Sequence, residues 1–358
     1  MHDSLLIDEP SKIRQGEEIN TEDLIEYLKK HISPAISQIE IKQFPSGFSN
    51  LTYLIKLNGK EYILRRPPFG KKAKTAHDMK REYTILSAIH PLFQYSPEPV
   101  LYCDDETIIG AQFYIMERIK GIILRKDLPS GVVLSRKEAR KLSENLISIL
   151  ATLHSIKYEE TPLKDIAHPK GYVTRQIEGW SNRYRDAKTP DAPDFEEIMQ
   201  WLAEKNPGDS QYISLIHNDY KFDNAVLKED NITEIIGILD WEMATIGDPF
   251  MDIGSSLAYW IEKKDPPQLQ AIRQMPTHID GMLTRREQFD LYCRLTNRES
   301  NNFDFYYCFG LFRLAVIAQQ IYYRFFHGQT SDLRFKPLVS YVKILENTAL
   351  DLIKKSDI

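Results

Sequence analysis

The sequence predicts an α+β protein, in which a small part with an antiparallel sheet and a helix precedes a larger, mostly helical part. In residues 36–118, short runs of alternating apolar residues predict strands, and Asn58-Gly59 joins two of them. Asn-Gly between two such runs is the strongest short-range hairpin signal. From Lys120 onward, apolar residues recur mainly at helical spacing. We therefore expect residues 1–35 to form an arm and a helix, residues 36–118 a small lobe, and residues 119–358 a large lobe.

The small lobe is expected to contain five strands and one internal helix. The strands are predicted at residues 36–44, 51–57, 60–66, 99–102 and 112–119, and the helix at about residues 75–88. Ahead of the sheet, Thr21 with Glu22 and Asp23 resembles a helix start. Residues 1–20 are polar, so a loosely held arm is predicted there.

The large lobe opens with a capping box, Ser135 and Glu138, which begins a helix predicted to end near His154. Further helices are predicted at residues 172–185, 194–205, 285–295, 303–326 and 337–354. A Pro-containing excursion at residues 264–282 is interpreted as a flap. The helix at 303–326 is apolar nearly all round, so it should be buried. Arg313 lies inside it and needs a partner, either a carboxylate of the protein or an anionic group of a substrate.

Composition favours an ordinary globular protein and excludes few function classes. Hydrophobic residues make up 42% and charged residues 27% of the 358 positions, values typical of soluble domains. The net charge of −5 argues against a general nucleic-acid binder, which would be basic. A chain of this length buries a sizeable core without disulfides or metals. We expect a monomer or a homodimer.

The cysteines and the N-terminus favour a cytoplasmic protein. Cys103, Cys293 and Cys308 are widely spaced and odd in number, so neither a disulfide framework nor a zinc site is predicted. The first residues lack a basic region followed by an apolar core, so no signal peptide is expected. No run of about 18 apolar residues is present, so no membrane span is predicted.

Residues 216–254 carry the candidate chemistry, in the stretch IHNDYKFDNAVLKEDNITEIIGILDWEMATIGDPFMDIG. Apolar runs at 224–227 and 235–239 flank a polar turn at 228–231, which predicts a hairpin. A His-x-Asp precedes the first run and an Asp-Trp follows the second. The hairpin therefore brings His217, Asp219 and Asn224 to the same end of a small sheet as Asp240.

That set of residues suits phosphoryl transfer. The reaction needs metal ions to neutralise phosphate charge and a carboxylate to orient the attacking hydroxyl. Asp240 and Asn224 supply the hard oxygen ligands that Mg²⁺ prefers. Asp219 lies five residues before Asn224, the D-x-x-x-x-N spacing of the kinase catalytic loop, and would accept the proton of the substrate hydroxyl.

HNDYKFDN followed by ILDWEMATIGDPFMDIG resembles the Brenner-type motif of the aminoglycoside phosphotransferase and choline kinase family. The usual family pattern is HGDxxxxN, then IDWE, then GDPxxD, and this chain departs from it only at Asn218. The resemblance covers about residues 44–326. It implies a bilobal protein-kinase-like fold, and an ATP- and Mg²⁺-dependent enzyme that transfers the γ-phosphoryl group to a hydroxyl of a small molecule.

Structural explanations stand beside the functional ones for several of these residues. Asp240 could cap a turn, and Trp241 is better explained as a core residue. Asp252 is interpreted as the cap of a helix that starts near Ile253 and as a brace of the catalytic loop. For His217 a role in hydrogen-bonding the loop is favoured over chemistry. His154 matches a frequent family position and is interpreted as a packed, hydrogen-bonded core residue.

In the small lobe, the resemblance implies a set of nucleotide contacts. The turn at residues 45–50 would cover the ATP phosphates with Ser46, Gly47, Phe48 and Ser49. The hinge backbone at 117–119 would bind adenine through Glu117 and Ile119, and Met116 would line the pocket.

Arg65 takes the position of the phosphate-binding Lys of protein kinases, and Glu82 on the internal helix would pair with it. A guanidinium can grip phosphate bidentately. Arg66 is the competitor for this role. Strand alternation points Arg66 to the opposite face, where a solvated edge arginine is expected.

The acceptor is the least defined part of the prediction. LRRPPFGKKAKTAHDMKREY and GLFRLAVIAQQIYYRFFHG resemble the branch of the family whose members are also fused to acyl-CoA dehydrogenases. That branch suggests a hydroxylated acyl compound or another anionic metabolite. The alternatives are an aminoglycoside kinase, a nucleotide-binding pseudokinase, and a metal-dependent phosphohydrolase using His217, Asp219 and Asp240. No nucleic acid or membrane partner is expected.

Overall fold

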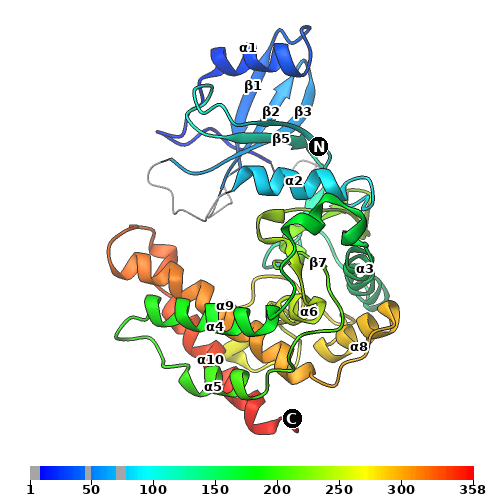
Figure 1. Ribbon diagram of the computed structural model, residues 1–358, viewed down its shortest axis with the longest axis vertical. Helices are drawn as coiled ribbons and strands as arrows, with labels where there is room; N and C mark the ends of the chain where they lie inside the picture. The colour runs from blue at the N-terminus through cyan, green and yellow to red at the C-terminus, as the bar shows by residue number, and fades with distance from the viewer. Residues whose placement is uncertain (1–8, 45–49, 70–77) are drawn as a thin grey trace. The chain divides into compact units, whose positions relative to one another are not determined.

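The computed structural model of the chain describes residues 9–44, 50–69 and 78–358. It divides into two units, drawn in Figure 1. The first unit contains the chain up to Ile123 together with Asn224–Ala244, and the second contains Leu124–Asp223 and Thr245–Ile358. The sequence predicts one boundary after residue 118, with the hairpin of residues 224–239 in the large lobe. This hairpin instead belongs to the first unit, where its first strand pairs with residues 122–123.

The first unit is built on a five-stranded antiparallel sheet of order β1-β2-β3-β5-β4. Its strands are β1 (Ile39–Gln43), β2 (Leu51–Leu57), β3 (Lys60–Arg66), β4 (Pro99–Cys103) and β5 (Phe113–Glu117). The strands β2 and β3 have the predicted bounds. At their turn Asn58 and Gly59 both have positive φ, 47° and 92°, as a two-residue hairpin turn requires.

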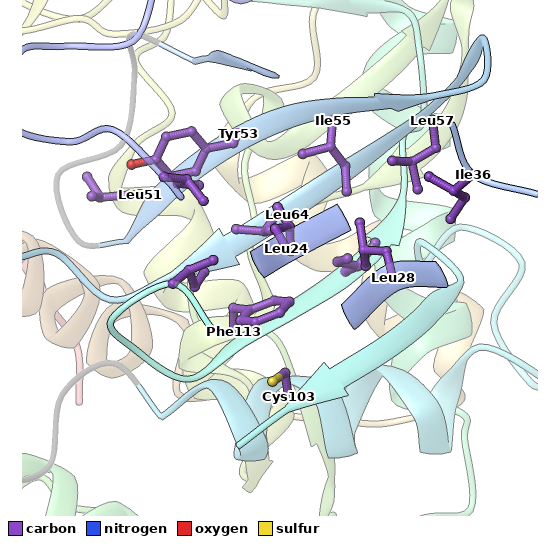
Figure 2. Packing of buried hydrophobic residues seen from close by; sticks show 13 residues of the cluster. Leu24, Leu28, Ile36, Leu51, Tyr53, Ile55, Leu57, Leu64, Cys103 and Phe113 are labelled. Atoms are coloured by element: carbon purple, nitrogen blue, oxygen red, sulfur yellow. The ribbon is translucent and has the colours of Figure 1, made fainter. Parts of the chain in front are cut away.

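Helix α1 (Thr21–His31) covers one face of this sheet. Figure 2 shows Leu24 and Leu28 of α1 among sheet side chains that include Leu64 and Phe113. Leu24, Leu28, Leu64 and Phe113 are all fully buried. Removing this apolar area from water is the main force that holds α1 on the sheet.

Helix α2 (Met79–Ile89) lies against the other face of the sheet, since Tyr83 packs on Tyr102 and Tyr114. The side chain of Asp78 accepts a hydrogen bond from the N–H of Arg81 and caps the helix. The predicted start near residue 75 falls outside the described residues. Because α2 is fixed on this face, Glu82 faces the sheet and is buried.

The predicted loose arm is wrong for residues 9–20. Ser11 forms a β-bridge with Gln43 of the edge strand β1. The Gln43 amide binds the carboxylate of Glu17 at 2.5 Å, and the Tyr53 hydroxyl donates to the Glu17 carbonyl at 2.7 Å. The arm therefore occupies backbone groups of an edge that would otherwise be open.

The second hairpin of the first unit consists of β8 (Ala225–Lys228) and β9 (Asn231–Ile238), and β6 (Ile122–Ile123) pairs with β8. The hairpin was predicted from its two apolar runs and is confirmed. Ile238 also donates its N–H to the carbonyl of Tyr95 at 2.7 Å. These contacts fix the end of the hairpin that carries Asn224 and Asp240.

The second unit is mostly helical, as predicted, and the fold class is α+β. Its helices are α3 (Arg136–His154), α4 (Tyr172–Ala187), α5 (Glu196–Glu204), α6 (Pro249–Ala258), α7 (Pro267–Ala271), α8 (Arg285–Thr296), α9 (Phe303–Phe326) and α10 (Leu338–Lys355). A small antiparallel pair, β7 (Ser214–Ile216) and β10 (Thr245–Gly247), accompanies them. Both hydrogen bonds of the Ser135–Glu138 capping box are present.

Helix α9 forms the core of this unit and contacts α4, α6 and α10 (Figure 1). It is buried over most of its length, as predicted from its apolar sequence. Two glycines let α9 and α6 approach closely. A Cβ on Gly310 would lie 2.2 Å from the carbonyl oxygen of Gly254, and one on Gly254 would lie 2.3 Å from that of Tyr306. No side chain fits at this crossing.

The excursion at residues 264–282 is fixed to the second unit rather than free, contrary to the flap interpretation. Leu269, Met275 and Thr277 are buried. The Thr277 hydroxyl accepts the N–H of Ile261 and donates to the carbonyl of the same residue. Across the described ranges, no helix combines the length and the apolar character needed to cross a membrane.

Candidate active site

In the second unit, strand β7 leads into the loop His217-Asn218-Asp219, and a buried carboxylate holds that loop. The Asp252 carboxylate accepts the N–H of His217 and the N–H of Asn218, both at 2.7 Å. The predicted brace is therefore present. The predicted helix cap is wrong, because Asp252 lies inside α6 and Asp248 caps that helix through the N–H of Phe250. The dipeptide Asp248-Pro249 is typical of a helix start and could have identified Asp248 as the cap.

His154 and His217 both have the structural surroundings predicted for them. His154 is buried, with Nε2 at 3.1 Å from Asp252 and Nδ1 at 2.8 Å from the Tyr292 hydroxyl. Asp219 donates its N–H to Nδ1 of His217 at 3.2 Å. His217 thus forms a hydrogen bond inside the loop, and His154 contacts Asp252, the carboxylate that holds the loop.

Asn218 departs from the family pattern without losing the loop geometry. Its φ is 65°, in the left-handed region, which glycine adopts without steric cost. Among other residues, Asn is one of the most tolerant of this region. The substitution keeps the turn that places Asp219.

Asp219 is paired with Lys221, a residue that sequence reasoning missed. The Lys221 ammonium lies 2.7 and 2.6 Å from the two carboxylate oxygens of Asp219. Burial alone would raise the pKa of Asp219, but Lys221 lowers it below its ordinary value. The same ammonium lies 4.6 Å from the ring centre of Tyr259. Asp219 is therefore held as the ionised carboxylate.

Arg313 of α9 adds a second positive charge to these surroundings. Its guanidinium lies 5.1 Å from the ring centre of Trp180, and its charge helps to lower the pKa of Asp219. Arg313 is buried, as predicted from its apolar helix.

In the first unit, Arg65 of β3 forms the predicted ion pair with Glu82 of α2. The distance is 2.6 Å, and both side chains are more than nine-tenths buried. The guanidinium also contacts Asp240 at 3.1 Å and Glu242 at 3.3 Å. Burial would lower the pKa of Arg65, but Glu82, Asp240 and Glu242 raise it, whereas burial raises the pKa of Glu82. One guanidinium thus joins the helix carboxylate to the candidate metal ligand.

Arg66 lies on the opposite face, as alternation predicted, but the solvated arginine expected there is wrong. Arg66 is 1% exposed. Its guanidinium donates to the carbonyls of Pro67 and Ile109 and lies 3.7 Å from the ring centre of Phe69. The alternation of side chains along a strand predicts which face of the sheet a residue lies on. It does not predict whether other residues cover that face.

Asn224 and Asp240 lie next to each other at the end of the second hairpin. The carbonyl of Asn224 accepts the N–H of Leu239 at 2.8 Å, one residue before Asp240. Asp240 has a φ of 67°, an uncommon conformation that often marks functional positions. The Trp241 indole donates to the carbonyl of Ile238 at 2.9 Å and is buried, as expected of a core residue.

Glu242 is a second residue that sequence reasoning quoted in its motif but did not use. Its carboxylate accepts a hydrogen bond from the Asn50 amide at 2.8 Å and contacts Arg65. Arg81 of α2 donates to the carbonyl of Glu242 at 3.1 Å. Glu242 and Asp240 therefore both form ion pairs with the guanidinium of Arg65.

The other predicted nucleotide contacts stay predictions, and the structure describes the surroundings of only some of these residues. Ser46, Gly47, Phe48 and Ser49 lie outside the described residues. Met116 of β5 is buried, and the Glu117 side chain is exposed. The N–H of Glu117 donates to the carbonyl of Glu98 at 2.8 Å, so it is not free for adenine. Ile119 packs on Gly237, where a Cβ would lie 2.6 Å from its Cδ1.

Among the residues that the structure describes, no group of three or more His, Cys, Asp or Glu side chains is arranged to hold a metal ion. The oxygens of Asn224, Asp240 and Glu242 are nevertheless of the kind that Mg²⁺ binds.

Residues 40–287 of the chain match the phosphotransferase enzyme family. The chain belongs to this family. Acyl-CoA dehydrogenase family member 10 of Mus musculus is 34% identical to it over 323 residues, which are 89% of this chain. Acyl-CoA dehydrogenase family member 11 of Homo sapiens is 30% identical over 336 residues, or 92% of this chain. The predicted likeness to the branch with acyl-CoA dehydrogenase names is confirmed. The chain spans only 30% and 42% of these two relatives' own lengths.

Solved structures share the fold. A Ralstonia eutropha protein provisionally named an aminoglycoside phosphotransferase is 26% identical, with a TM-score of 0.79 over 95% of this chain and 100% of that one. Choline kinase from Cryptosporidium parvum is 15% identical, with a TM-score of 0.64 over 94% and 96% of the two chains. The GDP complex of aminoglycoside 2'-phosphotransferase-IIIa is 17% identical, with a TM-score of 0.60 over 93% and 99%. The chain therefore combines membership of the phosphotransferase enzyme family with the fold of these solved structures.

Proposed function

We propose that this phosphotransferase moves the γ-phosphoryl group of ATP, in the presence of Mg²⁺, to a hydroxyl group of a small anionic metabolite. A hydroxyacyl compound is our first candidate acceptor. The observation that carries the proposal is the ion-pair cluster in which Arg65 joins Glu82 to Asp240. A cation held by a helix carboxylate beside a metal ligand is the arrangement that kinases use to bind phosphates.

Arg65 is the residue that binds the phosphates in this proposal. Its guanidinium presents two parallel N–H groups, which match phosphate oxygens bidentately. Glu82 fixes its orientation at 2.6 Å and is itself held by α2. The other hydrogen bonds of the guanidinium go to Asp240 and Glu242, so a phosphate would bind beside these two carboxylates.

Asn224 and Asp240 would hold Mg²⁺. The Asp240 side chain is 36% exposed, so its carboxylate is open to an ion, and Asn224 adds an amide oxygen. Mg²⁺ is commonly bound by one or two such groups together with phosphate oxygens and water. When bound, the ion neutralises charge on the phosphates.

Asp219 would orient the acceptor hydroxyl and take its proton. Since Lys221 lowers its pKa, the carboxylate is ionised at neutral pH and able to accept a hydrogen bond. The Asp252 brace gives the loop one conformation, which is what a reaction driven by positioning needs.

The charges near Asp219 favour an anionic acceptor. Lys221 and Arg313 are both cationic, and both lower the pKa of Asp219. Each lies over an aromatic ring, Tyr259 for Lys221 and Trp180 for Arg313. A carboxylate or phosphate of the acceptor would gain charge-assisted hydrogen bonds there, and the rings suit an apolar chain.

The same charges disfavour the aminoglycoside alternative. Aminoglycosides are polycations, and the Arg313 guanidinium would repel them, whereas the charge of Lys221 is balanced by Asp219. The relatives with acyl-CoA dehydrogenase names are also consistent with an acyl acceptor, although those names describe other proteins.

The test is turnover of Mg·ATP and Mg·GTP with a panel of hydroxyacyl-CoAs, sugars, amino alcohols and aminoglycosides. For the best anionic acceptor, Arg313→Gln should lower kcat/KM by roughly 10- to 100-fold, the worth of one hydrogen bond to a charged group. The KM for ATP should stay unchanged. The matched control is Arg324→Gln, which removes an exposed arginine from the same helix.

Two results would contradict the proposed acceptor class. One is a polycationic aminoglycoside as the best substrate. The other is equal loss of kcat/KM in Arg313→Gln and Arg324→Gln for the anionic acceptor.

A further inference from the structure

A chain of buried hydrogen bonds runs from the end of α8 to the catalytic loop. Arg298 donates to the Tyr292 hydroxyl at 2.8 Å, and that hydroxyl lies 2.8 Å from Nδ1 of His154. Nε2 of His154 lies 3.1 Å from Asp252, which accepts the N–H groups of His217 and Asn218. Tyr292, His154 and Asp252 are each at most 1% exposed. Tyr292 of α8 and Arg298, just beyond the C-terminal end of α8, are thus connected to the loop that carries Asp219.

The direction of every hydrogen bond in this chain follows from its two ends. The carboxylate of Asp252 can only accept, so Nε2 of His154 carries the hydrogen. In a neutral ring Nδ1 is then bare and accepts from the Tyr292 hydroxyl. The hydroxyl oxygen of Tyr292 in turn accepts from Arg298, which can only donate. Burial lowers the pKa of His154, in keeping with the neutral ring.

Arg298 also forms hydrogen bonds with the end of α3 and with strand β7. Its Nη2 donates to the carbonyl of His154 and to the Ser214 hydroxyl, both at 2.9 Å. Ser214 belongs to β7, the strand that leads into the loop, and its hydroxyl donates to the same His154 carbonyl at 2.8 Å. One guanidinium therefore ties the end of α3 to the start of the catalytic loop.

The end of α8 fixes the place of Arg298. Asn297 ends the helix with a φ of 50°, and the Arg298 N–H bonds to the carbonyl of Cys293 at 3.1 Å. The guanidinium also lies 5.4 Å from the ring centre of Tyr212. The backbone bond to Cys293, the hydrogen bonds to His154 and Ser214 and the ring of Tyr212 all restrain Arg298. Arg298 is therefore a rigid donor to Tyr292.

We propose that Tyr292 and Arg298 are positioning residues for phosphoryl transfer. They act through His154 and Asp252 to hold the loop in the conformation that aims Asp219. The assignment rests on the proposed function for the role of Asp219, whereas the chain itself stands on the contacts above. Without the Tyr292 hydroxyl, Nδ1 of His154 loses its donor and the His154 ring is free to change tautomer or rotate. The Asp252 brace then loses its defined partner.

The test compares Tyr292→Phe with Tyr306→Phe. Both changes remove one buried hydroxyl of the second unit, but Tyr306 donates to Asp248 and lies outside the chain. Tyr292→Phe should lower kcat about 10- to 100-fold with the KM for ATP unchanged, as expected when a supporting hydrogen bond is lost. Tyr306→Phe should keep the wild-type kcat. Arg298→Gln should reproduce the kcat loss of Tyr292→Phe, and Arg298→Lys should recover part of it.

A second readout does not depend on activity. Hydrogen exchange of the amides of His217 and Asn218, which donate to Asp252, should speed up in Tyr292→Phe and not in Tyr306→Phe. A wild-type protein that transfers no phosphate would overturn the proposed function, and the exchange rates would still decide whether the chain holds the loop. Equal kcat and equal exchange in the two Phe variants would overturn the positioning role.

Discussion

At the residue scale, Asp248 shows how burial and capping set the protonation of one carboxyl group. It is fully buried, and it accepts the N–H of Phe250 at 2.8 Å and the Tyr306 hydroxyl at 3.3 Å. Burial raises the pKa of Asp248 to about 6, from an ordinary value of 3.8. The folded protein therefore binds this proton more tightly than the unfolded chain does.

The stabilising effect of that proton depends on pH in a defined direction. It is fully present below the unfolded pKa of 3.8 and is lost as the pH rises through about 6. Asp248→Asn keeps a capping oxygen and carries no charge. Between about pH 4 and pH 7, the free energy of unfolding of Asp248→Asn should rise relative to wild type by roughly 2 kcal/mol.

Urea unfolding at several pH values measures this difference. The control is Asp230→Asn, which removes a carboxylate whose side chain is 78% exposed; its curve should run parallel to that of wild type. If Asp248→Asn also runs parallel to wild type, the buried carboxyl does not titrate as described.

Residue-level sequence reasoning succeeded where a motif specified the partner. The Arg65–Glu82 pair was predicted because kinases place a cation and a helix carboxylate at these positions, and it is present at 2.6 Å. Arg66 was misjudged because its cover, Phe69 and Ile109, lies beyond the strand. Lys221 was missed although it stands two residues after Asp219, because a tight loop follows neither helical nor strand periodicity.

At the element scale, the crossing of α6 and α9 depends on glycine. A Cβ on Gly310 would lie 2.2 Å from the Gly254 carbonyl oxygen and 3.1 Å from the Cα of Ser255. These are backbone atoms, which cannot yield as a flexible side chain can. Gly310→Ala should therefore destabilise the protein by about 1–3 kcal/mol or more, the cost of overpacking a core.

Gly179→Ala on α4 is the matched control. Its added Cβ would meet only the end of the Arg183 side chain, at 3.5 Å. Alanine is the better helix former, so this change should stabilise the protein by up to about 1 kcal/mol. Thermal and urea unfolding distinguish the two substitutions; the close crossing is refuted if Gly310→Ala unfolds like Gly179→Ala.

Local signals predicted elements well, and contacts between elements were the harder part. Asn58-Gly59 gave β2 and β3 their bounds, and Ser135 with Glu138 gave the start of α3. The polar composition of residues 9–20 predicts a loose arm, because composition alone does not show that an edge strand needs a partner. The same limit applies to the excursion fixed by Thr277.

At the scale of the whole molecule, the candidate functional residues within each unit come from distant parts of the sequence. Asp219, Asn224 and Asp240 could be predicted as site residues because their motif, in residues 216–254, is short and ordered. Tyr292 and Arg298 gave no signal, since their partners lie 138 and 144 residues away, at His154. Only the fold brings such groups together.

The most direct test of the account compares Mg·ATP-dependent phosphorylation of the best acceptor by wild type and by Asp219→Asn, with ATP binding measured alongside. The account predicts that Asp219→Asn loses about 10²- to 10⁴-fold in kcat, the usual contribution of a positioned base. Its ATP affinity should remain at the wild-type value, because Arg65, Asn224 and Asp240 are unchanged. A wild type that does not bind ATP, or an Asp219→Asn variant that turns over at the wild-type rate, would contradict the account.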